Sequence, residues 1–356
     1  MFTDATLMIS VIIPVHNGGE SFHRCLLSLA KSVPPPGEII VVADGDTDGS
    51  WRLASELGAL VLFIPIAGGP AKARNLGART ARGDILFFVD ADVAVCPETV
   101  GKVAIALQNE PDIAALIGSY DDAPGETNFL SQYKNLFHHY VHQTASEEAS
   151  TFWGACGAIR SEIFLEMGGF DESYRQPTVE DIDLGYRLKV AGYKIRLCKT
   201  LQVKHLKRWG VRSLLKADFF YRALPWTKLI LRFRQTCPQD FRRVTNDLNL
   251  QLSSRISVIL TYSLALVLVA AYWWSFLLVV AGVIILSLFA LNAPLYQFFQ
   301  RQRGLWFALG AIPWHWLYYL YSGLAFAIGI VFYVCDRIPT SISPTKNAGS
   351  NNQYSF

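Results

Sequence analysis

The stretch GDILFFVDADV, at residues 83–93, sets five consecutive apolar residues directly before two aspartates that are separated by one alanine. A continuous apolar run bounded by polar residues is typical of a strand in the middle of a sheet covered on both faces. Because side chains alternate along an extended chain, Asp90 and Asp92 leave the carboxyl end of this strand on one side. Ligands of open α/β sheets bind at that end, although a turn with two solvated acids would show the same letters.

Two neighbouring carboxylates repel each other unless a cation lies between them. Asp90 and Asp92 therefore predict a site for Mg²⁺ or Mn²⁺, which could bridge to a diphosphate. The six cysteines lack the spacing of metal ligands, so sulfur is not expected to take part.

Strands and helices alternate on the N-terminal side of this motif. Strands are predicted at 9–15, 38–43 and 59–64, and helices at 51–57 and 73–81. A further helix is indicated by the apolar face Phe22, Cys25, Leu26 and Leu29. This alternation predicts an α/β fold with a doubly wound, Rossmann-like sheet.

The pattern is less regular on the C-terminal side. Residues 118–153 are polar and aromatic without a clean period, and we interpret them as helix and loop over the mouth of the site. A helix is predicted at 181–191 and a strand at 193–198. Three histidines without metal-like spacing are assigned structural roles: His138, His139 and His142.

The last third of the chain differs in composition from the rest. Of the 356 residues 51% are hydrophobic and 17% are charged, and the apolar excess lies in this last third. Such a chain is too apolar for a purely soluble protein, which predicts attachment to a membrane. The net charge of +3 does not support a nucleic-acid partner, and the scattered cysteines fit reduced thiols facing the cytosol.

Three apolar runs predict about three transmembrane helices. The runs 256–272 and 276–291 are separated by Trp273 and Trp274, which predicts a hairpin that turns at a membrane interface. A third run occupies residues 305–334. Because Pro313 and His315 interrupt this run, residues 305–312 are either part of the span or interfacial, and in the second case the span begins near Trp314.

Basic residues indicate the orientation in the membrane. They flank the apolar runs on one side, at Arg242, Arg243, Arg255, Arg301 and Arg303. By the positive-inside rule, the N-terminal domain is expected at the cytoplasmic face of the inner membrane. Residues 213–234 interleave bulky apolar residues with Lys and Arg, which predicts a helix in the headgroup plane or an ordinary amphipathic core helix.

Five motifs follow one another along the chain: VIIPVHN from Val11, VVADGDTDGS from Val41, GPAKARNLGARTARGDILFFVDADV from Gly69, GACGAIRSEIFLEMGGFDE from Gly154 and VEDIDLGYRLKVAGYKI from Val179. In order and spacing they resemble the motifs of inverting family-2 glycosyltransferases with the GT-A fold. The resemblance covers residues 8–205, and many bacterial members also carry a membrane tail. It implies transfer of a sugar from a nucleoside-diphosphate sugar.

The resemblance implies that Asp44 contacts the nucleotide base. The same pocket would be shaped by Pro14, Val15 and Asn17. A carboxylate can accept the N3–H of uracil, so a UDP-sugar is favoured. The chain departs from the DDGS that is common in the family by having Ala43 before Asp44 and Asp46 after Gly45, and we interpret Asp46 and Asp48 as turn formers.

The resemblance also implies the residues that meet the phosphates and the metal. Arg74 matches the arginine of the family, and Lys72 is either a neighbour of the phosphates or a solvated lysine. Asp90 would position the sugar or ribose, and Asp92 would bind the metal. His205 follows the strand after the last motif, where some members place a metal-binding histidine.

Asp181, in the pair Glu180-Asp181, falls at the predicted start of a helix, where the helix dipole favours an ionised carboxylate. The resemblance assigns Asp181 as the general base that takes a proton from an acceptor hydroxyl. A phosphate acceptor would need no base, so the motif favours a hydroxyl. Trp153 and Gly154 would form the acceptor wall, with a buried structural Trp as the alternative.

We therefore predict a metal-dependent glycosyltransferase that acts on a membrane lipid or lipid-linked glycan. Its expected parts are a catalytic domain (1–212), an amphipathic interfacial segment (213–250), transmembrane helices (251–336) and a disordered tail (337–356). Two alternatives are a processive polysaccharide synthase and a non-catalytic sugar-nucleotide-binding protein. The segment YRALPW carries Arg222 and Trp226 but not the QxxRW typical of processive synthases, and the aspartates argue against a non-catalytic role.

Overall fold

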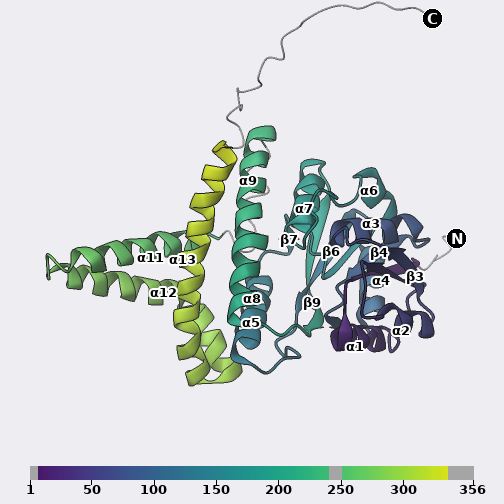
Figure 1. Ribbon diagram of the computed structural model, residues 1–356, viewed down its shortest axis with the longest axis horizontal. Helices are drawn as coiled ribbons and strands as arrows, with labels where there is room; N and C mark the ends of the chain where they lie inside the picture. The colour runs from purple at the N-terminus through teal and green to yellow at the C-terminus, as the bar shows by residue number, and fades with distance from the viewer. Residues whose placement is uncertain (1–6, 240–250, 336–356) are drawn as a thin grey trace, which may run out of the picture.

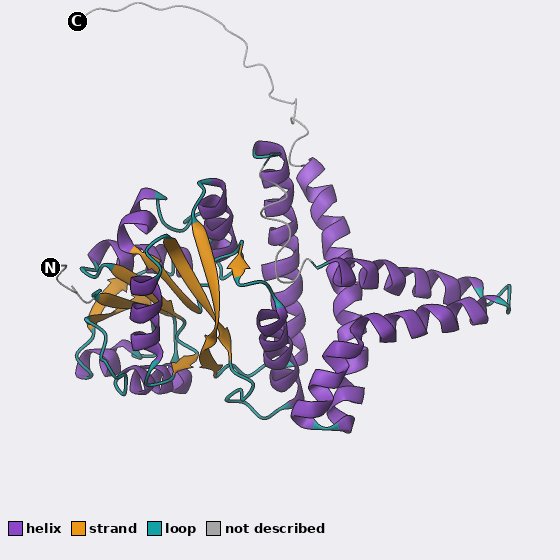
Figure 2. Cartoon of the chain, turned by 180° about the vertical axis from the view of Figure 1, so that it is seen from behind, coloured by secondary structure: helices purple, strands orange, loops and turns teal. Residues whose placement is uncertain are grey.

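The computed structural model describes residues 7–239 and 251–335. A sheet flanked by helices forms the N-terminal part, and an all-helical part follows it (Figures 1 and 2). The strands are β1 (Ile9–Val15), β2 (Glu38–Asp44), β3 (Leu60–Ile64), β4 (Ile85–Val89), β5 (Val93–Val95), β6 (Ile113–Tyr120), β7 (Glu148–Ala149), β8 (Cys156–Arg160) and β9 (Lys194–His205). The helices of this part are α1 (Gly19–Leu29), α2 (Trp51–Glu56), α3 (Pro70–Thr80), α4 (Thr99–Asn109), α5 (Phe129–Thr144), α6 (Ser161–Glu166) and α7 (Glu180–Val190).

The sheet has the order β3-β2-β1-β4-β8-β6-β9-β5, and β7 pairs with β9. The first four strands in this order run parallel, whereas β8 is antiparallel to β4 and β5 is antiparallel to β9. The predicted α/β class is confirmed, with a mixed sheet. The parallel strands bring the carboxyl ends of β1, β2 and β4 to one edge.

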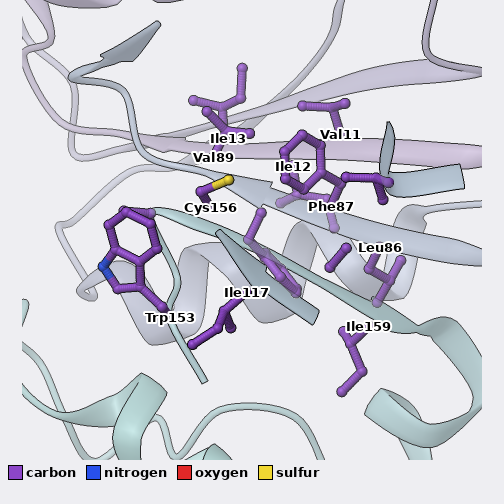
Figure 3. Packing of buried hydrophobic residues seen from close by; sticks show 14 of the residues in the cluster. Val11, Ile12, Ile13, Leu86, Phe87, Val89, Ile117, Trp153, Cys156 and Ile159 are labelled. Atoms are coloured by element: carbon purple, nitrogen blue, oxygen red, sulfur yellow. The ribbon is translucent and has the colours of Figure 1, made fainter. Parts of the chain in front are cut away.

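Core side chains cover both faces of β4. All five of its residues are buried, as the apolar run predicted. The ring of Phe88 lies 6.0 Å from that of Phe152 and 5.2 Å from those of Phe164 and Phe170, and Figure 3 shows neighbouring core residues such as Phe87. Each fully buried side chain of this size stabilises the fold by about 2 kcal/mol. The buried strand therefore fixes the backbone position of the two aspartates that follow it.

Helix α5 lies in the stretch that was predicted as irregular helix and loop. It spans 16 residues and packs against β6 and β9 of the sheet and against α12 (Leu277–Arg303) of the helical part. Because two of its faces are covered, its apolar residues show no single stripe. The structural roles of two histidines are confirmed, since His139 Nδ1 lies 2.7 Å from the carbonyl oxygen of Tyr120 and His142 Nδ1 lies 2.9 Å from that of Gly118.

Strand β9 is longer than predicted. It continues to His205, which is its last residue and does not follow it. Pairing with β6 along most of this length extends the strand beyond Cys198, where the apolar pattern becomes interrupted by polar residues.

The helical part consists of α8 (Val211–Lys216), a π-helical turn η1 (Ala217–Ala223), α9 (Leu224–Thr236), α11 (Leu252–Ala270), α12 and α13 (Leu305–Cys335). The last three are long and apolar enough to cross a membrane. Helix α12 continues through Pro294 to Arg303 instead of ending near residue 291, and α13 continues through Pro313. Residues 240–250 of the predicted interfacial segment and the tail 337–356 lie outside the described residues.

Helix α9 is attached to α7 of the catalytic part. Leu229 and Phe233 of α9 are buried beside Tyr186. Arg232 donates to Asp183 at 2.5 Å, and the indole N–H of Trp226 donates to the hydroxyl of Tyr186 at 2.9 Å. The amphipathic segment thus buries one face against the helix that begins with Glu180.

Candidate functional site

Asp44 ends β2 and is only 5% exposed. Its Oδ1 accepts the backbone N–H of Gly68 at 2.7 Å, and its Oδ2 accepts that of Gly69 at 2.8 Å. The carboxylate therefore fixes the loop before α3. The last residues of β1, Pro14 and Val15, lie beside the end of β2. A carboxylate has about four acceptor positions, so Asp44 keeps capacity for the N–H of a base.

Asn17 joins the loops that follow β1 and β2. Its Oδ1 accepts the N–H groups of Thr47 at 2.8 Å and Asp48 at 3.2 Å. The Asp46 carboxylate accepts the N–H of Asn17 at 2.9 Å and that of Gly49 at 3.1 Å. The interpretation of Asp46 as a turn former is confirmed, and Asn17 lies at the edge where the base pocket was predicted.

Arg74 connects three parts of the site. Its side chain is buried, its Nη2 donates to Asp90 Oδ1 at 2.6 Å, and its Nη1 donates to Glu180 Oε1 at 2.8 Å. Burial alone would lower the pKa of the guanidinium, but the charges of Asp90, Glu180 and Asp181 raise its pKa well above the usual value. A buried cation therefore ties α3, the end of β4 and the start of α7 together. Lys72, two residues earlier on α3, is exposed.

Asp181 is the second residue of α7 and is half-buried. Its Oδ2 accepts the backbone N–H of Gly154 at 3.1 Å, and its Oδ1 accepts that of Ile182 at 2.8 Å. Burial and the neighbouring charge of Glu180 raise the pKa of Asp181 to about 6, although the charge of Arg74 opposes the shift. At neutral pH the group is ionised, and its pKa is close to the value that suits a general base.

Gly154 lies between Asp181 and Arg74. A Cβ at this position would lie 2.9 Å from Arg74 Cζ, so a larger residue must displace the guanidinium. We expect Gly154→Ala to lower kcat/KM by about tenfold or more, which corresponds to about 1.4 kcal/mol of lost transition-state stabilisation. Steady-state kinetics measures this. Gly282→Ala on α12, where an added Cβ meets nothing within 4 Å, is the matched control, and equal kcat/KM for the two variants would contradict the expectation.

Asp92 lies next to His205 because Val93 of β5 pairs with His205 of β9. The Oδ2 of Asp92 lies 3.9 Å from His205 Nε2 and 3.6 Å from Lys207 Nζ. Burial, and then the charge of Lys207, lower the pKa of His205 to about 3. The imidazole is therefore neutral, which is the form that binds a metal.

The donor atoms fit Mg²⁺ or Mn²⁺ as part of a coordination sphere. Among the described residues, no group of three His, Cys, Asp or Glu could hold a metal ion unaided. Asp92 and His205 offer one carboxylate and one imidazole, while Asp90 has Oδ1 engaged by Arg74. Both cations commonly keep water and take substrate phosphate oxygens as further ligands.

Trp153 is 7% exposed and belongs to a buried aromatic cluster. Its ring centroid lies 4.8 Å from that of Tyr120 and 4.9 Å from that of His138. Tyr120 stacks in turn on His205 at 4.2 Å. The Trp153 ring thus presents little open surface for a sugar, in agreement with the structural alternative, whereas the neighbouring Gly154 touches Asp181 directly.

Arg222 was not assigned to the site from the sequence. It is exposed on η1, in a π-helical turn, a feature that is frequent at functional sites. Behind the larger effect of burial, its positive charge acts to lower the pKa of both Asp181 and His205. A charge on the helical part therefore acts on the pKa of the candidate base and of the histidine at the candidate metal site. The deviation from QxxRW in YRALPW was the only sequence signal at this position.

Comparisons with known proteins agree with these observations. Residues 10–168 match the model of the family described as Glycosyl transferase family 2. The chain is 25% identical over 242 residues to the O-antigen chain rhamnosyltransferase RfbN of Salmonella typhimurium, covering 62% of this chain and 74% of that protein. It is 29% identical over 235 residues to the pre-mycofactocin glycosyltransferase of Mycobacterium tuberculosis, covering 60% of this chain but only 46% of that protein.

Two solved structures share the fold. The mannosyltransferase PcManGT from Pyrobaculum calidifontis, in complex with GDP-Man and Mn²⁺, superposes with a TM-score of 0.63 at 17% identity, over 91% of this chain and 88% of that chain. Staphylococcus aureus TarS 1-349 in complex with UDP-GlcNAc superposes with a TM-score of 0.52 at 19% identity, over 69% and 73%. The chain thus carries a Glycosyl transferase family 2 domain with a GT-A-like fold, followed by helices long and apolar enough to span a membrane.

Proposed function

We propose that this enzyme transfers a sugar from a nucleoside-diphosphate sugar to a hydroxyl of a membrane lipid or lipid-linked glycan, with Mg²⁺ or Mn²⁺ and with inversion at the anomeric carbon. As a family-2 glycosyltransferase it uses a nucleotide-sugar donor. The observation that carries the proposal is the buried Arg74, which joins Asp90 after β4 to Glu180 beside Asp181. Donor-side and acceptor-side carboxylates are thereby held in one network.

The donor would lie along the carboxyl ends of β1, β2 and β4. Asp44 would accept an N–H of the base, within the pocket shaped by Pro14, Val15 and Asn17. Lys72 and Arg74, on the first turns of α3, would face the phosphates. The two solved relatives bind donors with different bases, so the preference for UDP rests on the carboxylate of Asp44 alone.

Asp92 and His205 would hold the metal, and Asp90 would orient the sugar or ribose. A divalent cation supplies positive charge to the diphosphate as it departs. Lys207, whose ammonium lies 3.6 Å from Asp92, adds a positive charge at the same edge. The neutral imidazole of His205 is kept in place by its stacking on Tyr120.

Asp181 would act as the base. It takes the proton of the acceptor hydroxyl while that oxygen forms a bond to the anomeric carbon. The bond from this carbon to the diphosphate oxygen breaks on the opposite face, so the configuration inverts in one displacement. The N–H of Gly154 orients the carboxylate, and Glu180 acts through its charge on Asp181 and its ion pair with Arg74.

The pH dependence should follow the ionisation of Asp181. Its pKa is raised to about 6, so the base becomes protonated as the pH falls through that value. We expect kcat/KM to be constant above about pH 7 and to fall tenfold for each pH unit well below 6. A pH–rate profile at saturating metal measures this, and a rate unchanged down to about pH 5 would contradict it.

The acceptor is assigned to the membrane because the helical part is joined closely to the catalytic residues. Helix α9 is held to α7 by Arg232 and Trp226, so the membrane-proximal helix lies next to the start of the base-carrying helix. We assign catalysis to residues 1–212 and membrane association to residues 213–336. The basic residues around the apolar helices favour a cytoplasmic catalytic domain.

The acceptor assignment is tested with purified full-length enzyme, Mn²⁺, a panel of UDP- and GDP-sugars and total membrane lipid, with mass spectrometry of the products. We expect one donor to add a single sugar to a lipid. A ladder of added sugars would instead indicate processive synthesis. If the enzyme transferred sugar to soluble acceptors and left the lipid unmodified, the assignment of a membrane acceptor would be wrong.

A further inference from the structure

The half of the α11–α12 hairpin that lies away from its turn contacts α13. The hydroxyl of Tyr262 donates to the carbonyl oxygen of Leu320 at 2.7 Å, and a Cβ on Gly323 would meet the Tyr262 ring. On α12, Asn292 accepts a hydrogen bond from the hydroxyl of Tyr319 at 2.7 Å. All of these contacts fall in the middle of α13, and Figures 1 and 2 show the hairpin projecting crosswise from it.

The outer half of the hairpin is bare apolar surface. Its exposed residues include Leu266, Leu268, Val269, Tyr272, Trp273, Trp274, Phe276, Leu278, Val279, Val280 and Val283. Such a surface is stable only in contact with hydrocarbon or another apolar partner. The 19 residues of α11 extend about 28 Å, close to the hydrocarbon thickness of a bilayer at about 30 Å. The aromatic residues at the turn then meet the far interface.

Helix α13 packs along its length against α5 of the catalytic part and against η1 and α9. Near its N-terminus, Ala308 and Ala311 are buried with Tyr133 and Leu136 of α5. In its middle, the hydroxyl of Tyr321 donates to Asp218 of η1 at 2.7 Å. Near its C-terminus, the neighbours belong to α9: the hydroxyl of Tyr333 bonds to Gln235 Oε1 at 2.9 Å, and Lys228 lies over the ring of Phe332 at 5.5 Å.

These neighbours carry charge beside the middle and the C-terminal part of α13. Asp218 is paired with Lys134 of α5 at 2.5 Å, and α9 presents Lys228, Arg232 and Arg234. If α13 crossed the bilayer, the adjoining charged helices would be carried to the same depth. Each Lys, Arg or Asp at the centre of a membrane costs about 2.5 kcal/mol or more. This cost argues against a third span.

Five of the exposed apolar residues of α13 form a stripe, whereas Phe326, Ile330 and Phe332 are exposed outside it. Trp306, Leu309, Leu317, Leu324 and Val331 recur at spacings that return to one side of an α-helix. With this stripe toward the lipid, α13 can rest on the bilayer surface and keep its contacts to the protein on its other sides. The contacts to α5, η1 and α9 come from the other sides of the helix.

We propose that only the α11–α12 hairpin crosses the membrane. Helix α13, which packs against α9, then lies in the headgroup plane of the leaflet that faces the catalytic part. The surface formed by the apolar stripe of α13 then takes the lipid bilayer as its partner. This arrangement fixes the height of α7 above the lipid, because Arg232 and Trp226 hold α9 to α7. The proposal rests on membrane attachment but not on the identity of donor or acceptor. A three-span arrangement differs from it in placing the end of α13 on the opposite side.

Cysteine accessibility in sealed vesicles of known orientation tests the proposal on the full chain. Cys335 is exposed at the end of α13 and Cys96 is exposed in the catalytic part, whereas Cys25 and Cys156 are buried. One variant keeps Cys335, and its Cys96, Cys198 and Cys237 are replaced by Ser. A second keeps Cys96 with Cys198, Cys237 and Cys335 replaced, and a third adds Trp274→Cys to the chain lacking all four. A membrane-impermeant maleimide labels each before and after detergent.

We expect Cys335 and Cys96 to be labelled from the same side and Trp274→Cys from the opposite side. Labelling of Cys335 from the side opposite Cys96, or only after detergent, would overturn the in-plane position of α13. Labelling of Trp274→Cys from the side of Cys96 would overturn the crossing hairpin. Because no sugar transfer is scored, failure here would leave the proposed reaction intact, and failure of the reaction would leave this result intact.

Discussion

Asp181→Asn should lower kcat by about 10²- to 10⁴-fold, the usual contribution of a general base, while the dissociation constant of the donor stays within about twofold. The amide has nearly the shape of the carboxylate and can still accept the N–H of Gly154, which the carboxylate accepts at 3.1 Å. It cannot take the proton of the acceptor hydroxyl. Single-turnover kinetics and donor titration measure the two quantities separately.

The matched control for Asp181→Asn is Asp112→Asn. Asp112 is exposed and pairs with Lys194 at 2.6 Å, away from the carboxyl ends of the parallel strands. This variant should retain the activity of the unmodified enzyme. Turnover of Asp181→Asn at the rate of the control would remove the assignment of the base.

Asp92→Asn should remove the metal-dependent part of donor affinity. The Asp92 carboxylate lies 3.9 Å from the neutral imidazole of His205, and an amide is a much weaker ligand for Mg²⁺ or Mn²⁺. We expect Mn²⁺ to tighten donor binding by about tenfold or more in the unmodified enzyme and by less than about twofold in the variant. Isothermal titration with and without Mn²⁺ measures both ratios.

Asp112→Asn again serves as the control, and it should keep the full effect of Mn²⁺. If Asp92→Asn bound the donor with the metal dependence of the unmodified enzyme, Asp92 would not be a metal ligand. The proposed role of His205 as a metal ligand would then be lost as well, because it rests on the position of His205 beside Asp92.

The elements with one clear pattern were predicted well from the sequence. Strand β1 and strand β4 were predicted with their observed bounds, since both are mainly apolar runs inside the sheet, with Ser10 and Pro14 as the exceptions in β1. The predicted apolar face of α1 is the set of its buried residues, namely Phe22, Cys25, Leu26 and Leu29. In these elements local pattern and tertiary environment agree.

Other elements depend on contacts that the local pattern does not contain. Strand β8 reads CGAIR and was not predicted, because its glycine is explained only by the close approach of Phe152 and the backbone of Trp153 to Gly157. Helix α5 was obscured because it is covered by the sheet and by the helical part. The length of β9 follows from its pairing with β6.

The candidate site shows the same division. The motifs indicated Asp44, Arg74 and Asp181 individually, through their order along the chain. The ion pairs of Arg74 with Asp90 and Glu180 join residues 16 and 106 positions apart, and no local signal links them. The pKa of Asp181 likewise depends on burial and on the charge of Glu180 in the folded state. The effect of the Arg222 charge on Asp181 and His205 depends on the position of η1 against the catalytic part.

The anomeric configuration of the product tests the central claim most directly. The purified full-length enzyme is incubated with the active donor and its lipid acceptor, and the new glycosidic bond is examined by NMR. If Asp181 deprotonates the acceptor for a single displacement, the linkage has the configuration opposite to that of the donor. A product that retains the configuration of the donor would contradict this account.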